Sequence, residues 1–409
     1  MEKLKIFVSA YACEPNKGSE IGVGWHWVLE MSKYFELWVL TRSNNQPPIE
    51  EYFSNHPEQD NIHWVYYDCP NFIKKFKKGI KGVRTYYTFW QYGSNSLVKK
   101  VMLENNIKVF HLLTYGNALW HVSSFGQKQF FIWGPTGGVD TIPNDFSKHY
   151  GLRNSLVEAV RRFVVATLPL NFGFKNRCKN ANLILCKSQY TVNAIPKKHR
   201  HKAVIFTDVA TNNFLETYEQ NFNHEPPTEY LIIGKLDAWR GFDLLIEAFK
   251  NAVNKNSNIH LTIMGKGSDK QRLEKLIKKY NLSKFVKMIG EVKIDEYYEY
   301  LKNADVIVNP SLKEGAVTVS FDAMRFGKPF ICVDTKGYSQ YFNNDYAIVL
   351  KRNNRQQLIS DLEKAVLLLT DVGERKRLSD EIIKQSDNFT WTEKGKQIKN
   401  IIDEYTKGL

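Results

Sequence analysis

From residue 230 onward, short apolar runs alternate strictly with amphipathic stretches, and this alternation limits the folds open to the chain more than any other feature. The apolar runs predict strands at 230–236, 260–264, 286–289, 306–309, 329–333 and 347–350. The amphipathic stretches predict helices at 241–254, 268–280 and 294–303, with a last helix at 392–405. Strands that alternate with helices form parallel sheets covered on both faces. The second half is therefore expected to be an α/β domain of Rossmann-like type.

The first half repeats this organisation. Its apolar runs predict strands at 4–10, 36–41, 62–67, 109–113, 129–133, 182–185 and 203–206. A chain of 409 residues exceeds what one hydrophobic core usually supports, so two domains are expected. The segment 208–228 is rich in Asn, Thr, Glu and Pro and is the predicted linker. The domains are then 1–207 and 229–388, followed by a C-terminal helix at 389–409.

Composition places the chain outside several other classes. No segment approaches the roughly 18 uninterrupted apolar residues of a membrane span, and the first residues lack the pattern of a signal peptide, so a cytoplasmic protein is expected. The five cysteines show no C-x-x-C spacing and are odd in number, which argues against a disulfide framework and a zinc site. Buried thiols are expected instead.

The segment 311–324, SLKEGAVTVSFDAM, follows a predicted strand that ends at Pro310. No helix breaker occurs from 318 to 326, so a strand, a loop and a helix are expected in succession. A helix start offers unpaired backbone N–H groups that bind phosphate. The amides expected to do so are those of Gly315, Ala316, Val317 and Thr318. The carboxylates of Glu314 and Asp322 can accept hydrogen bonds from sugar hydroxyls, so the segment predicts a sugar-nucleotide site.

This segment resembles the signature of the retaining family 4 glycosyltransferases of the GT-B fold, in which two acids lie eight positions apart, as Glu314 and Asp322 do. The resemblance implies that Glu314 binds the donor sugar and that Asp322 binds the ribose. The family usually has Glu where Asp322 stands, and Asp is one methylene shorter.

The resemblance extends over most of the C-terminal half. The segments 233–236 and 239–241 match the phosphate-binding residues of the family, and Gly234 precedes Lys235 there. Lys235 stands where the family usually has Arg, and Arg240 stands where it usually has Lys. Gly265 and Lys266 match a glycine loop on the nucleotide side. Two surface cations without a ligand are the alternative interpretation of Lys235 and Arg240.

The resemblance implies a fold and a reaction. Two Rossmann-like domains would face each other across a cleft, with the last helix returning to the N-terminal domain. The reaction would be a retaining, metal-independent hexosyl transfer from a nucleoside diphosphate sugar of UDP or GDP type, without a cofactor. Lys235 and Arg240 would neutralise the departing diphosphate while Glu314 holds the sugar.

The loop 17–25 follows the first strand and opens a helix. Its glycines at 18, 22 and 24 do not have the G-x-G-x-x-G spacing, which argues against a dinucleotide-binding oxidoreductase. In the resembled family this loop lies beside donor phosphate and acceptor, which implies a donor contact for Gly18 and an acceptor contact for Glu20. The alternative is a glycine loop that permits a tight strand-to-helix turn.

Two further candidates lie in the first half. His111 belongs to a predicted strand where family members often carry a histidine near a sugar, so it is a catalytic candidate; an interior histidine is the alternative. Gly137 and Gly138 end the sequence WGPTGG after another strand, and small residues there would admit an acceptor. An ordinary turn would explain these glycines equally well.

The net charge of +14 is concentrated in part between Lys74 and Arg84, where cations alternate with large apolar residues. This pattern is typical of segments that sit at an anionic membrane surface, and it predicts a peripheral protein on the inner face of the cell membrane. A second basic cluster lies at 161–179. A solvated basic loop and an ordinary core helix are the alternatives. The clusters favour a saccharide or lipid-linked acceptor in cell-surface polysaccharide or glycolipid assembly.

Three other functions stay open at this point. A sugar-nucleotide epimerase or a glycogen-type synthase would share the fold. A non-enzymatic basic protein would bind its partner through positive charge alone. No helix-turn-helix or base-stacking signature supports nucleic acid as a partner. No D-x-D, H-x-x-x-H or G-x-S-x-G pattern stands in a suitable context, so neither a metal site nor a serine hydrolase is expected.

Overall fold

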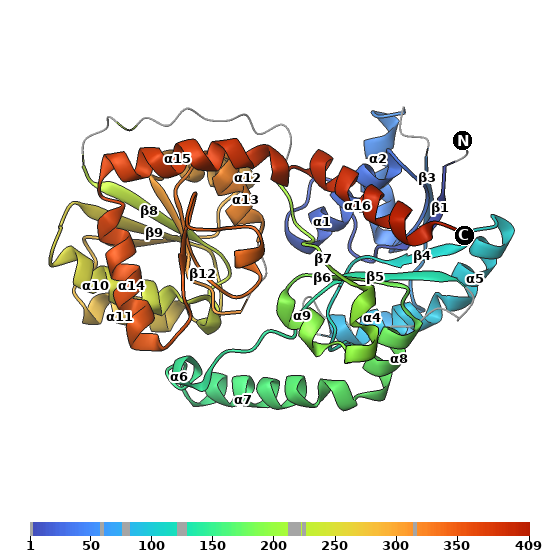
Figure 1. Cartoon of the computed structure of the whole chain (residues 1–409), viewed down its shortest axis with the longest axis horizontal. Helices are drawn as coiled ribbons and strands as arrows, with labels where there is room; N and C mark the ends of the chain where they lie inside the picture. The colour runs from blue at the N-terminus through green and yellow to red at the C-terminus, as the bar shows by residue number, and fades with distance from the viewer. Residues whose placement is uncertain are drawn as a thin grey trace. The chain divides into compact units, whose positions relative to one another are not determined.

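The computed structural model describes residues 3–57, 61–75, 82–120, 129–211, 222, 226–313 and 317–409. The chain divides into two compact units (Figure 1). The N-terminal unit comprises residues 1–139, 165–208 and 391–409, and the C-terminal unit comprises residues 140–164 and 209–390.

The N-terminal unit is built on a seven-stranded parallel sheet with the order β3-β2-β1-β4-β5-β6-β7. The strands are β1 Lys5–Ser9, β2 Glu36–Thr41, β3 Ile62–Tyr66, β4 Val109–Leu112, β5 Phe130–Thr136, β6 Leu183–Cys186 and β7 Ala203–Ile205. The helices are α1 Ser19–Ser32, α2 Gln46–Ser54, α3 Asn71–Lys74, α4 Val83–Gly93, α5 Asn95–Glu104, α8 Phe172–Asn180, α9 Gln189–Ala194 and α16 Trp391–Thr406. All seven strands that the apolar runs predict are confirmed.

The C-terminal unit is built on a six-stranded parallel sheet with the order β10-β9-β8-β11-β12-β13. The strands are β8 Thr228–Ile233, β9 Ile259–Met264, β10 Val286–Gly290, β11 Val306–Asn309, β12 Phe330–Val333 and β13 Ile348–Leu350. The helices are α6 Asn144–Ser147, α10 Phe242–Val253, α11 Lys270–Lys279, α12 Ile294–Asn303, α13 Thr318–Arg325, α14 Arg355–Leu368 and α15 Val372–Ser386, while α7 Leu152–Thr167 ends three residues beyond this unit. The six predicted strands are confirmed here too.

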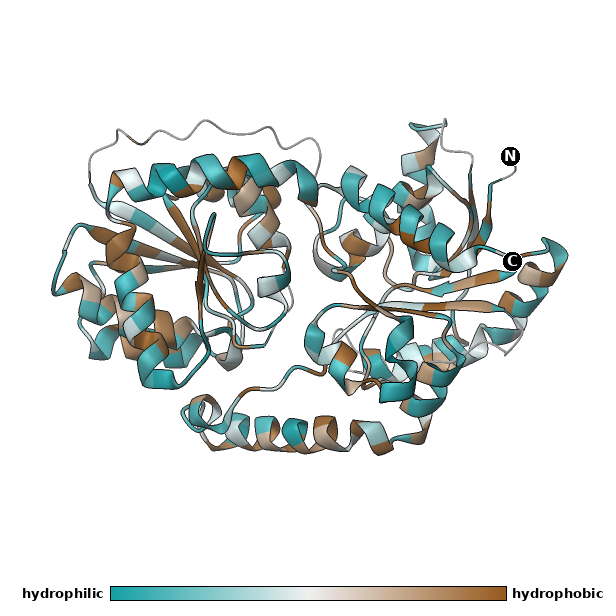
Figure 2. Ribbon diagram, viewed as in Figure 1, coloured by the Kyte–Doolittle hydropathy of each residue, from teal (hydrophilic) through white to brown (hydrophobic). Residues whose placement is uncertain are grey.

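The strands of both sheets are mainly apolar, and many of them are largely brown in Figure 2. All four residues of β4, β6, β11 and β12 are buried, which is typical of a parallel sheet covered on two faces. All five cysteines are buried free thiols, as expected. Among the described helices, none is long and apolar enough to cross a bilayer.

The segment 140–164 corrects the domain boundaries expected from the sequence. The prediction assigned residues 1–207 to one domain, whereas 140–164 group with the C-terminal unit. Ile142, Phe146 and Tyr150 lie in the core of that unit, and the backbone N–H of Arg355 donates to Asp145 Oδ2 at 2.8 Å. Hydrophobic periodicity reports only local structure, so it could not show which core these side chains enter.

The C-terminal helix α16 belongs to the N-terminal unit. It packs on α1, where the rings of His26 and Trp391 stack with their centres 5.1 Å apart. Most of the predicted linker 208–228 lies outside the described residues, and β8 already begins at Thr228. At its start, Thr211 forms an isolated parallel bridge with Thr390.

Candidate donor site and a candidate acceptor edge

The carboxyl ends of β8, β9 and β11 carry a set of basic side chains. Parallel sheets bind ligands beyond the carboxyl ends of their strands, because loops and helix starts converge there. The cations on the loops after these strands are Lys235, Arg240, Lys266 and Lys313. This edge of the C-terminal sheet is therefore suited to an anion.

Glycines let the loops at this edge approach one another closely. Gly265 has φ +138°, and a Cβ there would lie 1.9 Å from the carbonyl oxygen of Gly234. Gly241 has φ +74°, and its Cβ would lie 2.3 Å from the carbonyl oxygen of Pro310. The structure thus brings Gly234 and Gly265, two predicted donor contacts, into direct proximity.

Lys235 and Arg240 stand on the same loop, which leads from β8 to α10. The side chain of Lys235 is 65% exposed, and its Nζ lies 3.2 Å from Asp237 Oδ2. The guanidinium of Arg240 lies 4.6 Å from the centre of the Trp239 ring. Both residues lie on the loop that follows the strand end, and their phosphate role stays a prediction.

Lys313 is a basic residue of this edge that the sequence analysis did not single out. Its Nζ forms an ion pair with Glu158 of α7 and lies 5.2 Å from the centre of the Trp239 ring. Burial lowers the pKa of Lys313, and the Glu158 carboxylate opposes that effect. Its position directly before Glu314 in the predicted signature could have indicated Lys313 as a site residue. Its partner Glu158, however, lies 155 positions away in the sequence.

The central part of the predicted signature lies outside the described residues, namely Glu314, Gly315 and Ala316. Val317 caps α13, and its backbone N–H donates to Ser320 Oγ at 3.3 Å. Thr318 is the first residue of the helix. The helix start is confirmed where it was expected, and the phosphate contacts of these amides stay a prediction.

Asp322 has two partners inside its own unit. Its Oδ2 accepts a hydrogen bond of 2.7 Å from the hydroxyl of Tyr297, and its Oδ1 accepts one of 3.2 Å from the hydroxyl of Thr211. Burial raises the pKa of Asp322 to about 6. The ribose contact of Asp322 stays a prediction, and Tyr297 on α12 becomes a second candidate for this role. No spacing in the sequence pairs these residues.

Lys266 lies on the loop after β9 and forms an ion pair with Glu291, which follows β10. Both side chains are mainly exposed, at 73% and 60%. Such a pair contributes little to stability, so an incoming anion can exchange with the carboxylate at small cost.

The three predicted acceptor-side residues converge on one loop of the N-terminal unit, residues 115–118 after β4. The backbone N–H of Tyr115 donates to Glu20 Oε1 at 2.8 Å, and the N–H of Gly137 donates to the Gly116 carbonyl at 2.8 Å. Gly138 has φ +79°, and a Cβ there would lie 2.6 Å from Asn117 Nδ2. The sequence analysis missed this loop.

Gly18 and Gly22 differ in what they require of the loop before α1. Gly18 precedes the helix with φ −89°, and a Cβ would meet nothing within 4 Å. At Gly22 a Cβ would lie 2.0 Å from the carbonyl oxygen of Lys17. The close approach of the Lys17 carbonyl therefore explains why residue 22 is a glycine. No steric reason requires a glycine at position 18.

A cluster of aromatic rings lies beside the loop 115–118. The rings of Tyr87 and Trp120 lie close to the ring of Tyr115, with centres 5.0 and 5.4 Å away. The ring centres of Tyr11 and Tyr115 lie 5.0 Å apart, and the guanidinium of Arg42 lies 4.9 Å from the centre of the Tyr11 ring. Tyr11 and Tyr87 are fully buried, so this cluster belongs to the core of the N-terminal unit and supports the loop from behind.

His111 is fully buried on β4. Its Nε2 lies 2.7 Å from the Gly134 carbonyl oxygen, and its ring centre lies 6.0 Å from that of Trp27. Burial lowers the pKa of His111 to about 4, so the ring is neutral near pH 7. These surroundings match the alternative of an interior histidine, and the catalytic role stays a prediction.

The basic cluster between Lys74 and Arg84 is described only at its ends, because residues 76–81 lie outside the described part. Lys74 Nζ lies 3.4 Å from Asp68 Oδ2, and Arg84 Nη2 donates to the Leu119 carbonyl at 3.2 Å. A membrane role for this cluster stays a prediction.

Comparison with known proteins identifies one domain. Residues 215–385 match the model of the family described as glycosyl transferases group 1. The CapJ protein of Staphylococcus aureus is 26% identical over 186 residues, which cover 44% of this chain and 46% of that protein. An uncharacterised glycosyltransferase of Methanocaldococcus jannaschii is 25% identical over 265 residues, 58% of this chain and 63% of that protein. The chain thus spans about half the length of the first of these relatives and less than two thirds of the second.

Solved glycosyltransferase structures align along nearly the whole chain at low identity. Another solved structure, HepE of Anabaena in complex with UDP, is 13% identical with a TM-score of 0.60 and covers 98% of this chain and 100% of that chain. At such identity the likeness shows the fold alone. Together with the two parallel sheets, it confirms the predicted GT-B fold.

Proposed function

Since residues 215–385 match the model of the glycosyl transferases group 1 family, we propose that this protein transfers a sugar from a nucleoside diphosphate sugar to a hydroxyl acceptor. The anomeric configuration is retained, and no metal takes part. The observation that carries this proposal is the set of basic side chains at the carboxyl edge of the C-terminal sheet, beside the start of α13.

The donor diphosphate binds between the loop after β8 and the start of α13. Lys235 and Arg240 contact its oxygens and neutralise charge as the bond to the sugar breaks. Glu314 accepts hydrogen bonds from the sugar hydroxyls. The complex of the HepE neighbour with UDP supports a uridine nucleotide as the first donor to test.

The acceptor binds at the edge of the N-terminal sheet, where Glu20, Gly137 and Gly138 meet the loop 115–118. Its class is a saccharide or a lipid-linked saccharide in cell-surface polysaccharide or glycolipid assembly. A Campylobacter jejuni relative, 26% identical over 135 residues, is a transferase whose name specifies a diphospho-undecaprenol-linked acceptor. Such an acceptor would place the enzyme at the inner face of the membrane, with the Lys74 to Arg84 cluster toward anionic lipid.

A thermal-shift panel of UDP, GDP and ADP sugars tests the donor. A ligand at 100 times its Kd stabilises the fold by about 2.7 kcal/mol, so one nucleotide class should raise Tm clearly above the others. The sugar of the best donor is then offered to saccharide acceptors, and NMR reads the anomeric configuration of the product. No shift with any sugar nucleotide would contradict the proposal, and conversion of the donor without an acceptor would identify an epimerase.

The role of Glu314 is tested by Glu314→Gln. The substitution removes the anionic acceptor for the sugar hydroxyls, so kcat should fall on the order of tenfold to a thousandfold while Tm is kept. Glu381→Gln on α15 is the control, because that carboxylate pairs only with the neighbouring Lys384 among the contacts described. Near-normal turnover in Glu314→Gln would remove this residue from the site.

A further inference from the structure

Helix α7 presents an apolar face outward, a feature that the proposed reaction does not use. The exposed fractions are 95% for Leu152, 66% for Leu156, 56% for Val157, 54% for Val160, 69% for Phe163 and 41% for Val164. At about 100° per residue, these six positions fall within about 140° of the helix circumference. Every other described helix exposes at most two large hydrophobic side chains. The stripe is therefore a continuous surface and not a set of scattered residues.

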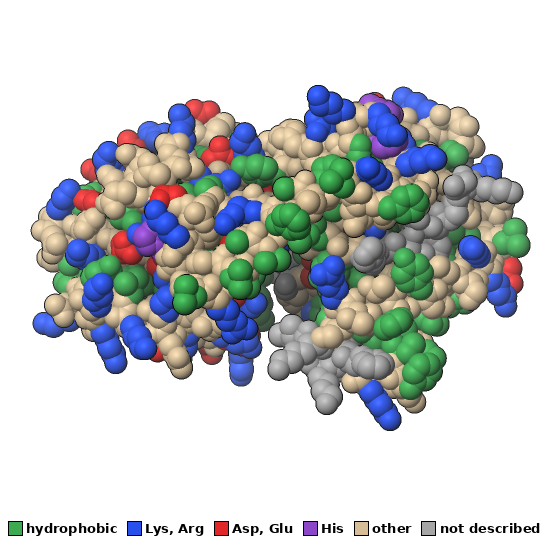
Figure 3. Space-filling view, turned by 90° about the horizontal axis from the view of Figure 1, so that it is seen from below, with side chains coloured by type: hydrophobic (Ala, Val, Ile, Leu, Met, Phe, Trp, Pro, Cys, Tyr) green, Lys and Arg blue, Asp and Glu red, His purple; other side chains and the backbone are tan. Residues whose placement is uncertain are grey.

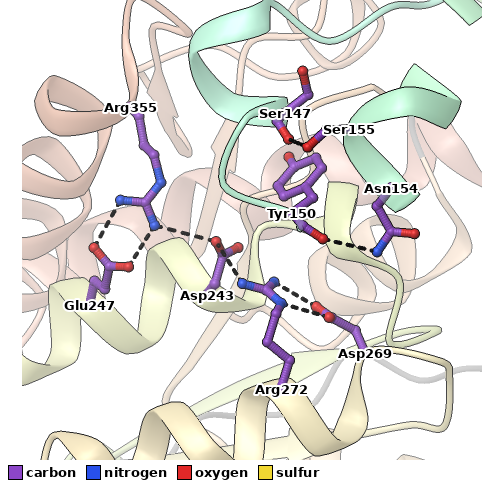
Figure 4. Close-up of polar contacts among 9 residues, drawn as sticks. All are labelled: Ser147, Tyr150, Asn154, Ser155, Asp243, Glu247, Asp269, Arg272 and Arg355. Carbon is purple, nitrogen blue, oxygen red and sulfur yellow. Dashed lines mark hydrogen bonds and ion pairs between the residues drawn. The ribbon is translucent and has the colours of Figure 1, made fainter. Parts of the chain in front are cut away.

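The opposite face of α7 is polar and is bound to the C-terminal unit. Its contacts are Asn154 Nδ2 to the Tyr150 carbonyl at 3.2 Å, Ser155 Oγ to the Ser147 carbonyl at 2.7 Å, Arg161 Nε to the Asp140 carbonyl at 3.0 Å, and Arg162 Nη1 to the Ile142 carbonyl at 3.1 Å. Figure 4 shows the first two of these contacts. A surface helix normally turns its apolar stripe inward. In α7 the orientation is reversed.

The segment before α7 holds the helix in this orientation. Tyr150 lies in the core of the C-terminal unit, and close by, the Arg355 guanidinium binds Glu247 through two hydrogen bonds of 2.9 and 2.6 Å (Figure 4). Asp243 is 1% exposed and lies between Arg355 and Arg272, at 3.3 and 3.5 Å. Tyr150 in this core and the 2.8 Å hydrogen bond from the backbone N–H of Arg355 to Asp145 Oδ2 anchor the segment before α7 to the C-terminal unit, and the bonds of the polar face of α7 to this segment leave the stripe exposed.

The charge on α7 favours an anionic occupant. Two of its three arginines, Arg161 and Arg162, donate to carbonyls on the polar face, and its single acid, Glu158, is 5% exposed and pairs with Lys313. The acid is therefore turned away from solvent, while Arg153 is exposed within the stripe. In Figure 3, which views the protein from the α7 side, hydrophobic side chains lie among Lys and Arg side chains. Apolar side chains with interspersed cations suit the headgroup region of anionic lipid.

We propose that the apolar face of α7 inserts into the surface of an anionic lipid bilayer. A second copy of this chain is a poorer occupant, because two such faces would bring like charges together in a protein of net charge +14. Exposing an apolar patch of this kind to water costs free energy, and such patches mark interaction surfaces. This membrane contact does not rest on the proposed transfer reaction.

A fluorophore placed on α7 tests the insertion directly. All five cysteines are buried, so the single exposed thiol of Val160→Cys can be labelled selectively with an environment-sensitive dye. On mixing with vesicles of phosphatidylglycerol and phosphatidylcholine, its emission should shift to the blue, and the shift should decline as salt rises. Leu103→Cys on α5 is the matched control, because Leu103 is 84% exposed and lies on another helix. Equal shifts at both positions, or none at residue 160, would overturn the proposal.

Vesicle sedimentation with the variant Leu156→Asn/Phe163→Asn gives an independent measurement. In this experiment Leu152→Asn/Leu156→Asn is compared beside it, because these two side chains are 95% and 66% exposed; its binding to the anionic vesicles should weaken at least tenfold while Tm stays unchanged. Leu103→Asn should bind like the parent. Unchanged binding of the Leu152→Asn/Leu156→Asn variant would refute insertion of α7. A parent that is dimeric by light scattering, with a monomeric double variant and no lipid binding by either, would assign the face to self-association and refute the lipid proposal.

Discussion

At the scale of single residues, charge placement at the C-terminal edge decides what the site can bind. Lys235 is exposed beside one carboxylate, Asp237, and Arg240 rests against the Trp239 ring. The exposed ammonium of Lys235 therefore keeps a positive field toward solvent beyond the strand end. In the proposed reaction, the two residues serve both the bound donor and the departing diphosphate.

We expect Lys235→Ala and Arg240→Ala each to weaken binding of the nucleoside diphosphate by about ten- to a hundredfold, because each removes one charge-assisted hydrogen bond. Transfer should slow by a similar factor. Isothermal titration with UDP and GDP measures the affinity. Lys275→Ala, an exposed lysine on α11, is the control and should bind like the parent. Parental affinity in both site variants would show that Lys235 and Arg240 do not bind the diphosphate.

Asp322 predicts a pH dependence of stability. Its pKa is about 6 in the fold because of burial, above its ordinary value of 3.8. Between these values the folded state binds more protons than the unfolded state, so the free energy of unfolding falls as pH rises from about 4 to about 6 and is then constant. The fall amounts to about 3 kcal/mol at most.

The variant Asp322→Asn should lack this fall, because the amide does not titrate. Urea unfolding of parent and variant at pH 4, 5, 6 and 7 measures the difference between the two curves. A difference that does not change with pH would show that Asp322 stays ionised throughout this range.

At the scale of elements, the loops after strands are shaped by glycines at points of close backbone approach. Gly265 and Gly234 come together after β9 and β8, and Gly241 approaches Pro310 after β11. The loops can therefore converge on a single ligand while the strands remain in register.

We expect Gly265→Ala to lower the free energy of unfolding by more than about 2 kcal/mol and to weaken donor binding. Its Cβ would lie 1.9 Å from a backbone oxygen at φ +138°, where L side chains are strained. Gly18→Ala is the matched control, since a Cβ at Gly18 meets nothing within 4 Å. Thermal unfolding compares the two variants, and equal stability would contradict the close approach.

At the scale of the whole molecule, two units with separate cores share one chain that passes between them more than once. Residues 140–164 leave the N-terminal unit to complete the C-terminal core, and α16 returns to pack on α1. Each unit therefore depends on segments remote in sequence. Neither corresponds to an uninterrupted half of the chain.

The whole enzyme should retain transfer activity in the presence of a chelator. The proposed mechanism places positive charge from Lys235, Arg240 and helix-start amides where a metal ion would otherwise stabilise the diphosphate. Initial rates with and without excess EDTA measure this, with protein that has been passed through a chelating resin. Loss of activity that added magnesium restores would contradict a metal-independent reaction.

The sequence by itself determined the thirteen strands, both sheets' parallel character and the start of α13, because apolar periodicity, proline and glycine act within a few residues. The resemblance of the segment around Glu314 and Asp322, and of the loop after β8, also predicts a donor site, and that role stays a prediction. These features are local, so no knowledge of the packing was needed.

Tertiary structure decided the rest, because it depends on contacts between residues far apart in sequence. Only packing showed that Ile142, Phe146 and Tyr150 enter the C-terminal core, and that Asp322 is held by Thr211 and Tyr297. The apolar side chains of α7 have the spacing of an ordinary core helix, and the sequence cannot tell inside from outside. The polar face of α7 bonds to the C-terminal unit instead, and this leaves the apolar face exposed.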